Sequence, residues 1–101
     1  MLTERVKVVT IITVFEAREL VREGFAGLGV VGYSSSHVDG VGAHGEKRSG
    51  ITGVKNLEYV VVVSQALAAR LLDWVEHKLL PHHPSIAYST DAVAVTAAPL
   101  R

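Results

Sequence analysis

Residues 56–63 read NLEYVVVV, and this stretch decides the fold. Valine favours a strand, because the turns of a helix restrict its branched side chain. The valine run is too apolar to leave either face of such a strand in water. The segment is therefore predicted to be a central strand of a sheet.

A helix and a further strand are predicted after this central strand. Ser64 suits the N-cap position, where its hydroxyl can accept a hydrogen bond from an unpaired amide. Apolar residues then recur at helical spacing on one face: Leu67, Ala68, Leu71, Leu72, Val75 and Leu79. Pro81 ends the helix, since proline cannot continue the backbone hydrogen bonding. Residues 85–95 (SIAYSTDAVAV) alternate in the manner of a strand.

The chain before the central strand has a similar order. Residues 6–13 (VKVVTIIT) predict a buried strand, and a helix to residue 28 follows. The apolar stripe of that helix consists of Ala17, Leu20, Val21, Gly24, Phe25 and Leu28. Thr13 and Glu16 have the spacing of a capping box, and Gly29 suits a left-handed C-terminal cap.

Between the first helix and the central strand lie a polar strand and a long loop. Residues 30–39 (VVGYSSSHVD) predict an exposed or ligand-facing strand. Residues 40–55 (GVGAHGEKRSGITGVK) have neither helical nor strand periodicity, and all nine glycines of the chain fall between Gly24 and Gly53. A connection longer than about 12–15 residues in a compact domain is usually functional or disordered.

The order of elements is strand, helix, strand, long loop, strand, helix, strand. It predicts the ferredoxin-like βαββαβ unit of the α+β class, an antiparallel four-stranded sheet with two helices on one face. The 101 residues are expected to form a single domain. Because no helix would cover the other sheet face, apolar residues there predict self-association.

Composition excludes several classes of protein. Ten Lys and Arg balance ten Asp and Glu, which disfavours a nucleic-acid binder that neutralises phosphates. No apolar run approaches the ~18–20 residues of a membrane span, and the N-terminus lacks the pattern of a signal peptide. The chain has no cysteine, which fits the reducing cytoplasm and excludes thiolate chemistry.

The glycine-rich loop has the chemistry of an anion site. Gly40, Gly42 and Gly45 match the dinucleotide fingerprint G-x-G-x-x-G, but the fingerprint requires a helix where this sequence predicts a strand. Glycines nevertheless allow backbone amides to approach a phosphate, and His44, Lys47 and Arg48 add donors nearby. The alternative is a solvated loop whose charges face water.

No dedicated metal or catalytic site is predicted. Among five histidines none has a ligand spacing, and Asp73 with His77 is expected to form a surface ion pair on one helix face. His82 and His83, between two prolines, indicate a polar turn. There is neither a hydrolytic triad nor a carboxylate pair, so an enzyme is disfavoured. Trp74 is expected to be a partly buried packing residue.

Residues 29–42 (GVVGYSSSHVDGVG) resemble the PII signalling family, and the order and spacing of elements extend the resemblance over the whole chain. The resemblance implies a homotrimer that holds adenine nucleotides in clefts between subunits. It also implies that residues 40–55 form a T-loop, which responds to the ligand and meets a partner protein.

The closer likeness is to the PII-like branch associated with carboxysomes and bicarbonate transport. The ending Ile86-Ala87-Tyr88 is similar to that branch, whereas PHHPS at residues 81–85 replaces the glycine-rich phosphate segment of nitrogen-regulatory PII proteins. The loop lacks tyrosine, so uridylylation is not expected. The resemblance implies AMP or ADP as ligand, with cyclic AMP, ATP and bicarbonate open, and a bicarbonate transporter or carboxysome-linked protein as partner.

Carried over by position, the resemblance implies a nucleotide site in three parts. The adenosine cleft would be lined by Gly32, Tyr33 and Ser34, the phosphate approached by Gly42, Ala43, His44, Lys47, Arg48 and Ser49, and the opposite wall formed by His83, Ser85 and Ile86. Either Lys47 or Arg48 would make the main phosphate contact.

The leading hypothesis is therefore a non-enzymatic cytoplasmic sensor. Two alternatives stay open at this point. One is a trimeric metal-binding protein that uses His44 with His82 and His83, and the other is a weak nucleotide hydrolase.

Overall fold

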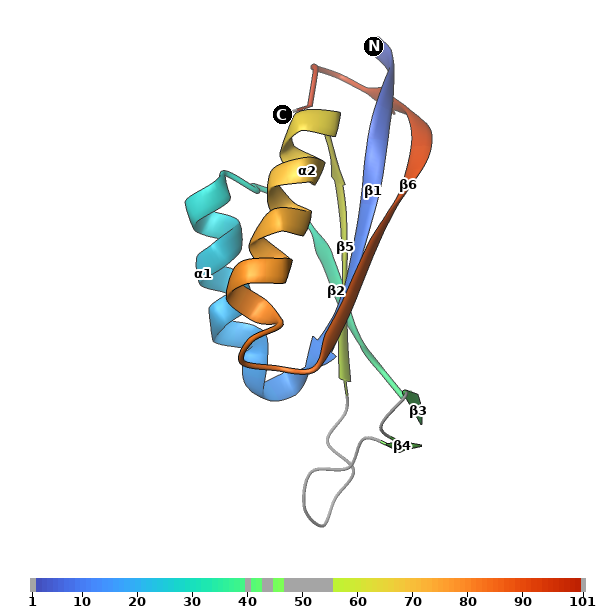
Figure 1. The fold of residues 1–101 in the computed structure, drawn as a ribbon. Helices are drawn as coiled ribbons and strands as arrows, with labels where there is room; N and C mark the ends of the chain where they lie inside the picture. Colours follow the sequence, from blue (N-terminus) through green and yellow to red (C-terminus); the bar gives the residue numbers. More distant parts are fainter. Residues whose placement is uncertain (1, 40, 43–44, 47–55, 101) are drawn as a thin grey trace.

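The computed structural model describes residues 2–39, 41–42, 45–46 and 56–100 (Figure 1). Its strands are β1 (Leu2–Val14), β2 (Ser34–Val38), β3 (Val41–Gly42), β4 (Gly45–Glu46), β5 (Asn56–Val63) and β6 (Ser85–Thr96). A 3₁₀ turn (Phe15–Ala17) leads into α1 (Arg18–Leu28), and α2 (Gln65–Trp74) continues as a π-helical turn (Val75–Leu79).

Four of the strands form one antiparallel sheet in the order β2-β5-β1-β6. Figure 1 shows α1 and α2 side by side on one face of this sheet. The predicted βαββαβ fold is confirmed. Inside the segment predicted to be an irregular loop, β3 and β4 pair as a separate antiparallel sheet of two strands.

The core lies between the helices and the sheet. β1 and β5 supply Val9, Ile11, Leu57, Tyr59, Val61 and Val63, and the helical layer supplies Val21, Phe25, Leu67, Leu71, Val75 and Leu79. The alternate residues of β5 are half-buried or exposed, and Val62 is 41% exposed. β5 lies between β2 and β1, so the prediction of a central strand is confirmed, and the second apolar face of the strand is not covered within the single chain.

The predicted caps at Ser64 and Gly29 are confirmed, and the predicted capping box at Thr13 is not. The Ser64 hydroxyl accepts a hydrogen bond from the Leu67 amide at 3.2 Å, and Gly29 has a φ of 85° at the end of α1. The predicted capping box of Thr13 and Glu16 is wrong. β1 continues to Val14, so Thr13 belongs to a paired strand and its side chain points into the core.

β2 is shorter than predicted. The prediction covered residues 30–39, but pairing with β5 spans only Ser34–Val38. The Val30 amide donates to the Phe25 carbonyl at 2.9 Å and thereby completes the end of α1 instead of joining the sheet. As predicted, the strand is polar and largely exposed.

α1 and α2 pack closely against each other at Gly24, a residue of α1 that has no side chain. Trp74 is half-buried and lies against Gly24, so closely that a Cβ at Gly24 would overlap the indole ring. Trp74 is thus the packing residue that its position beside the apolar stripe predicted. Within residues 2–39 and 56–100, no helix is long and apolar enough to cross a bilayer.

Candidate functional site

The predicted site residues fall at opposite edges of the sheet. Gly32, Tyr33 and Ser34 stand at the start of edge strand β2, and Ser85 and Ile86 open edge strand β6. β5 and β1 lie between the two edges, which separates the edge strands by about 14 Å at ordinary strand spacing. One chain does not bring the two groups together, so a site that uses both needs a second copy.

Tyr33 is anchored by other aromatic rings. Its ring centroid lies 4.8 Å from that of Phe25 and 5.9 Å from that of Tyr59, in edge-to-face and tilted arrangements. Burial raises the pKa of Tyr59, whereas Tyr33 remains 43% exposed. One side of the Tyr33 ring is therefore fixed by the core, and the other is open to a ligand or a neighbouring subunit.

Gly32 and Ser34 flank this ring on exposed backbone. Among the described residues, a Cβ placed on Gly32 would meet nothing within 4 Å. Packing of the single chain thus gives no reason for a glycine at this position. Ser34 shares a row of the sheet with Val60, Thr10 and Tyr88, on the face turned away from the helices.

Residues 82–85 are tied to two other elements. The amides of His82 and His83 both donate to the Leu79 carbonyl, at 3.0 and 2.9 Å. The Ser85 hydroxyl donates to the His83 carbonyl at 3.1 Å and lies 2.8 Å from the Thr13 hydroxyl. The predicted polar turn is therefore held in place by hydrogen bonds to Leu79 on one side and by the contact with Thr13 on the other.

Ser85 and Ile86 leave opposite faces of β6. Ser85 is opposite Thr13 and points to the helix side, where its hydroxyl is already bonded within the chain. Ile86 points to the open face and is 58% exposed. The sequence prediction included both residues but missed Thr13. The hydrogen bond from Thr13 to Pro84 joins positions 71 residues apart, and nothing in the sequence around Thr13 indicates it.

The phosphate part of the predicted site is described only at Gly42. Its backbone pairs with Gly45 in the small sheet of β3 and β4. Ala43, His44, Lys47, Arg48 and Ser49 lie outside the described residues.

The family model of the nitrogen regulatory protein P-II matches residues 6–97. This chain belongs to the P-II family. No curated protein is significantly similar to it in sequence.

Solved structures of other P-II-like proteins share its fold. A PII-like protein of Thermus thermophilus is 28% identical, with 94% of each chain covered and a TM-score of 0.77. CPII of Thiomonas intermedia, a nitrogen regulatory PII-like protein bound to ADP, AMP and bicarbonate, is 18% identical. That match covers 96% of this chain and 100% of CPII, with a TM-score of 0.79. Apo CPII matches at 16% identity and a TM-score of 0.73, with 92% of this chain and 95% of CPII covered.

In this P-II protein the end of β2 is held on the helix side by an aromatic contact. The rings of Phe15 and His37 stack with centroids 6.1 Å apart, and the Arg18 guanidinium lies 4.0 Å from the Phe15 ring centroid. Arg18 also donates to the Phe15 carbonyl at 3.2 Å. The 3₁₀ turn therefore supports β2 shortly before residues 40–55 begin.

The outer side of the P-II helices has the predicted ion pair. His77 Nδ1 lies 2.9 Å from the Asp73 carbonyl and 3.2 Å from its carboxylate. The carbonyl contact first, and the carboxylate second, raise the pKa of His77. Glu76 brings a third potential metal ligand that the sequence analysis missed, but all three side chains are exposed. Asp73 and His77 border a groove of about 390 Å³ along α2, which Trp74 and Leu28 also line.

Proposed function

We propose that this P-II protein is a regulatory sensor that binds an adenine nucleotide in clefts between the subunits of a homotrimer. The sheet order is the observation that carries the proposal. It puts the Tyr33 edge and the Ile86 edge on opposite sides of one chain, so that the Tyr33 edge of one copy can face the Ile86 edge of the next. A cleft of two such walls exists only in an assembly.

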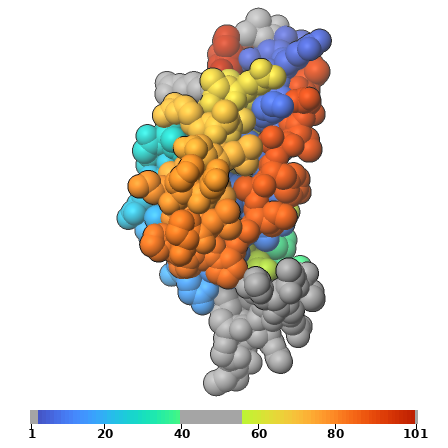
Figure 2. Space-filling view, viewed as in Figure 1, coloured from blue at the N-terminus to red at the C-terminus, as the bar shows by residue number. Residues whose placement is uncertain are grey.

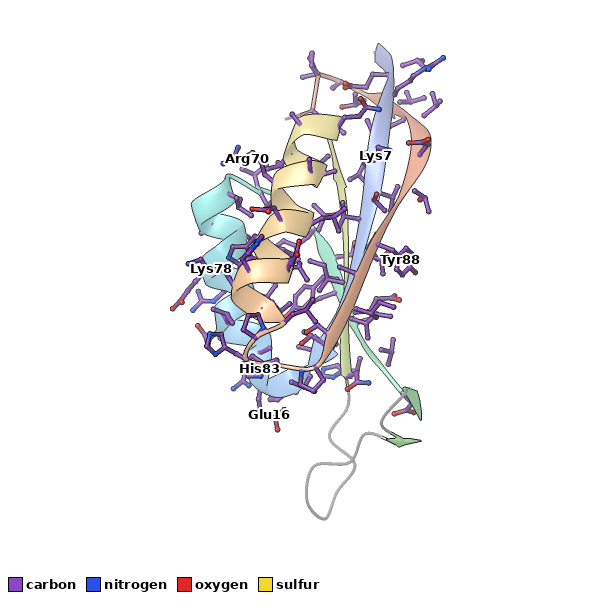
Figure 3. The ribbon with its side chains drawn as sticks, viewed as in Figure 1. Lys7, Glu16, Arg70, Lys78, His83 and Tyr88 are labelled. Atoms are coloured by element: carbon purple, nitrogen blue, oxygen red, sulfur yellow. The ribbon has the colours of Figure 1, made fainter. Side chains whose placement is uncertain are left out.

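The open face of the sheet supports the assembly. Val62, Ile86 and Tyr88 are 41%, 58% and 47% exposed there, beside half-buried Val8 and Ile12. Figure 3 shows Tyr88 on the side of the sheet away from the helices. Burial of apolar surface contributes about 25 cal/mol per Å², and a symmetric oligomer is the usual way to cover such a face.

The ligand we propose is AMP or ADP, with cyclic AMP and ATP as further candidates and bicarbonate as a second ligand. CPII, which shares the fold, was solved with ADP, AMP and bicarbonate. In this proposal Gly32, Tyr33 and Ser34 line the adenosine cleft, and His83, Ser85 and Ile86 form the opposite wall. The phosphate is met by Gly42, Ala43, His44, Lys47, Arg48 and Ser49, through amides and charge-assisted hydrogen bonds.

The output we propose is a change in the T-loop, residues 40–55, that selects a partner protein. β2 leads directly into β3, which lies beyond the end of the main sheet (Figure 1). A loop that nucleotide binding orders would act as the two-state element of a population shift. The setting is the cytoplasm, the partner a bicarbonate transporter or carboxysome-linked protein, and the activity regulatory instead of enzymatic.

Isothermal titration of the full chain with AMP, ADP, ATP and cyclic AMP, each with and without bicarbonate, tests the ligand. We expect saturable binding of at least one adenine nucleotide at one site per chain. Light scattering on the same sample should give the mass of a trimer. Absence of binding to all four nucleotides would overturn the proposal, and a monomer that still binds would overturn the shared cleft.

A further inference from the structure

Thr13 is a buried hydroxyl whose presence packing does not explain. Its exposure is 2%, and it lies at the end of β1 on the face that carries Val9 and Ile11. Burial of a hydroxyl costs free energy unless it is hydrogen-bonded. Valine has nearly the same shape and would fill this position without that cost.

The Thr13 hydroxyl contacts Pro84 and Ser85, the residues at which the chain enters β6. Thr13 Oγ1 lies 3.2 Å from the Pro84 carbonyl oxygen, to which it can donate, and 2.8 Å from Ser85 Oγ. Ser85 Oγ in turn donates to the His83 carbonyl at 3.1 Å. Thr13 and Ser85 thus share two hydroxyl protons among three contacts, namely the carbonyls of Pro84 and His83 and the contact between the two hydroxyls, in which either can donate.

The same segment is held from the other side by the helical layer. Both His82 and His83 donate their amides to Leu79, which ends the π-helical turn. Thr13 of β1 therefore holds the carbonyl of Pro84 directly and that of His83 through Ser85, while Leu79 holds the amides of His82 and His83. Figure 3 shows both His83 and Glu16 toward the end of the molecule where β1 passes into α1.

We propose that Thr13 is a positioning residue of the nucleotide site. It does not line the cleft, because it is buried beneath the loop that does. By fixing the backbone of Pro84 and Ser85, it sets where His83 and Ile86 meet the ligand. This inference rests on the proposed function, of which His83, Ser85 and Ile86 form one wall.

Three variants separate positioning from ordinary core packing. Thr13→Val keeps the shape and removes the hydroxyl, Thr13→Ser keeps the hydroxyl, and Ile11→Val trims a buried neighbour on the same face of β1 that makes no side-chain hydrogen bond. We expect Thr13→Val to weaken binding of the tightest adenine nucleotide about tenfold. Thr13→Ser and Ile11→Val should remain within about twofold of the parent chain.

A double-mutant cycle shows whether the effect passes through the loop. If Thr13 acts by placing His83, the losses from Thr13→Val and His83→Ala are not additive, because the second change removes a contact that the first has already displaced. Additive losses would overturn the inference. An unchanged affinity in Thr13→Val would also overturn it, as would equal losses in Thr13→Val and Thr13→Ser.

Hydrogen exchange measures the same positioning without any ligand. In Thr13→Val the amides of His82 and His83 should lose protection, and in Thr13→Ser they should keep it. Ser85→Ala provides the same readout if Thr13→Val does not fold. Absence of nucleotide binding by the parent chain would contradict the proposed function. Unchanged hydrogen-exchange protection of the His82 and His83 amides in these variants would contradict only the positioning role of Thr13.

Discussion

The indole of Trp74 occupies the space in which a Cβ of Gly24 would stand. A Cβ built there would approach three carbons of the ring to less than 3.0 Å, so α1 and α2 can pack this closely only if residue 24 is glycine. The contact joins two residues 50 positions apart in the sequence and fixes the spacing of the helical layer.

Gly24→Ala should therefore destabilise the protein by about 1–3 kcal/mol, since the tryptophan must leave its position. Gly27 provides the matched control. It lies in the same helix, and among the described residues a Cβ there would meet nothing within 4 Å. Gly27→Ala should stabilise the helix by about 0.5–1 kcal/mol. Chemical denaturation measures both changes, and shifts of equal sign would show that the Trp74 contact is not the cause.

A single introduced charge tests whether the open face of the sheet forms the subunit interface. Val62 is 41% exposed in the single chain, so Val62→Glu leaves the monomer core intact but puts a carboxylate into the proposed subunit interface. We expect light scattering to show a mass below that of the trimer. Ala66→Glu adds the same charge at the exposed start of α2 and should remain trimeric. A Val62→Glu trimer of unchanged stability would place the interface elsewhere.

The ion pair on α2 predicts a dependence of stability on pH. His77 has its pKa raised above the ordinary 6.5 in the folded chain, so its contribution is complete below pH 6.5 and disappears as pH rises through the folded pKa. The difference in Tm between the parent chain and His77→Gln should therefore be larger at pH 5.5, where the ring is protonated in both the folded and the unfolded chain, than at pH 9.

Titration of the His77 ring by NMR separates the two causes of its raised pKa. Asp73→Asn removes the carboxylate but keeps the backbone carbonyl, which is the larger cause. The pKa of His77 should therefore fall only part of the way toward 6.5 in Asp73→Asn. A complete return to that value would mean that the carboxylate alone is responsible.

The basic pair of the T-loop is the test of the phosphate site. Lys47→Ala combined with Arg48→Ala should weaken nucleotide binding by about 2 to 5 kcal/mol, because charge-assisted hydrogen bonds contribute about 1.5–3 kcal/mol each. Arg70→Ala combined with Lys78→Ala removes the same charge from the helices, where Figure 3 shows both side chains on the side away from the sheet. Isothermal titration should give an unchanged affinity for this control. Equal losses in the two double variants would indicate long-range charge instead of contact.

Local signals in the sequence predicted most of the fold. The apolar spacing of α2, the Ser64 cap and the left-handed Gly29 all depend on neighbours within about one helical turn, which a sequence displays directly. The same kind of local reasoning failed at Thr13. Its spacing to Glu16 fits a capping box, but pairing with Ser85 extends β1 through that position.

The candidate site was harder to predict, because its parts come from distant segments. The resemblance named Tyr33 and Ile86 as opposite walls of a cleft between subunits, and the strand order then placed them at opposite edges of the sheet in each chain. The sequence did not indicate the aromatic anchor of Tyr33, since Phe25 comes from α1 and Tyr59 from β5. Figure 2 shows β6 running along one side of the molecule, where a neighbouring copy can reach it.

The sequence by itself determined the type and order of the two helices and of the four strands of the main sheet, and it indicated the family, because periodicity, caps and the glycine cluster are local properties of the chain. Only the tertiary structure decided which residues meet across the core. It brought Trp74 onto Gly24, tied Thr13 to Pro84 and Ser85, and left Val62 and Tyr88 on an open face. Those contacts follow from strand order and register, which depend on the packing of all elements at once and not on any one segment.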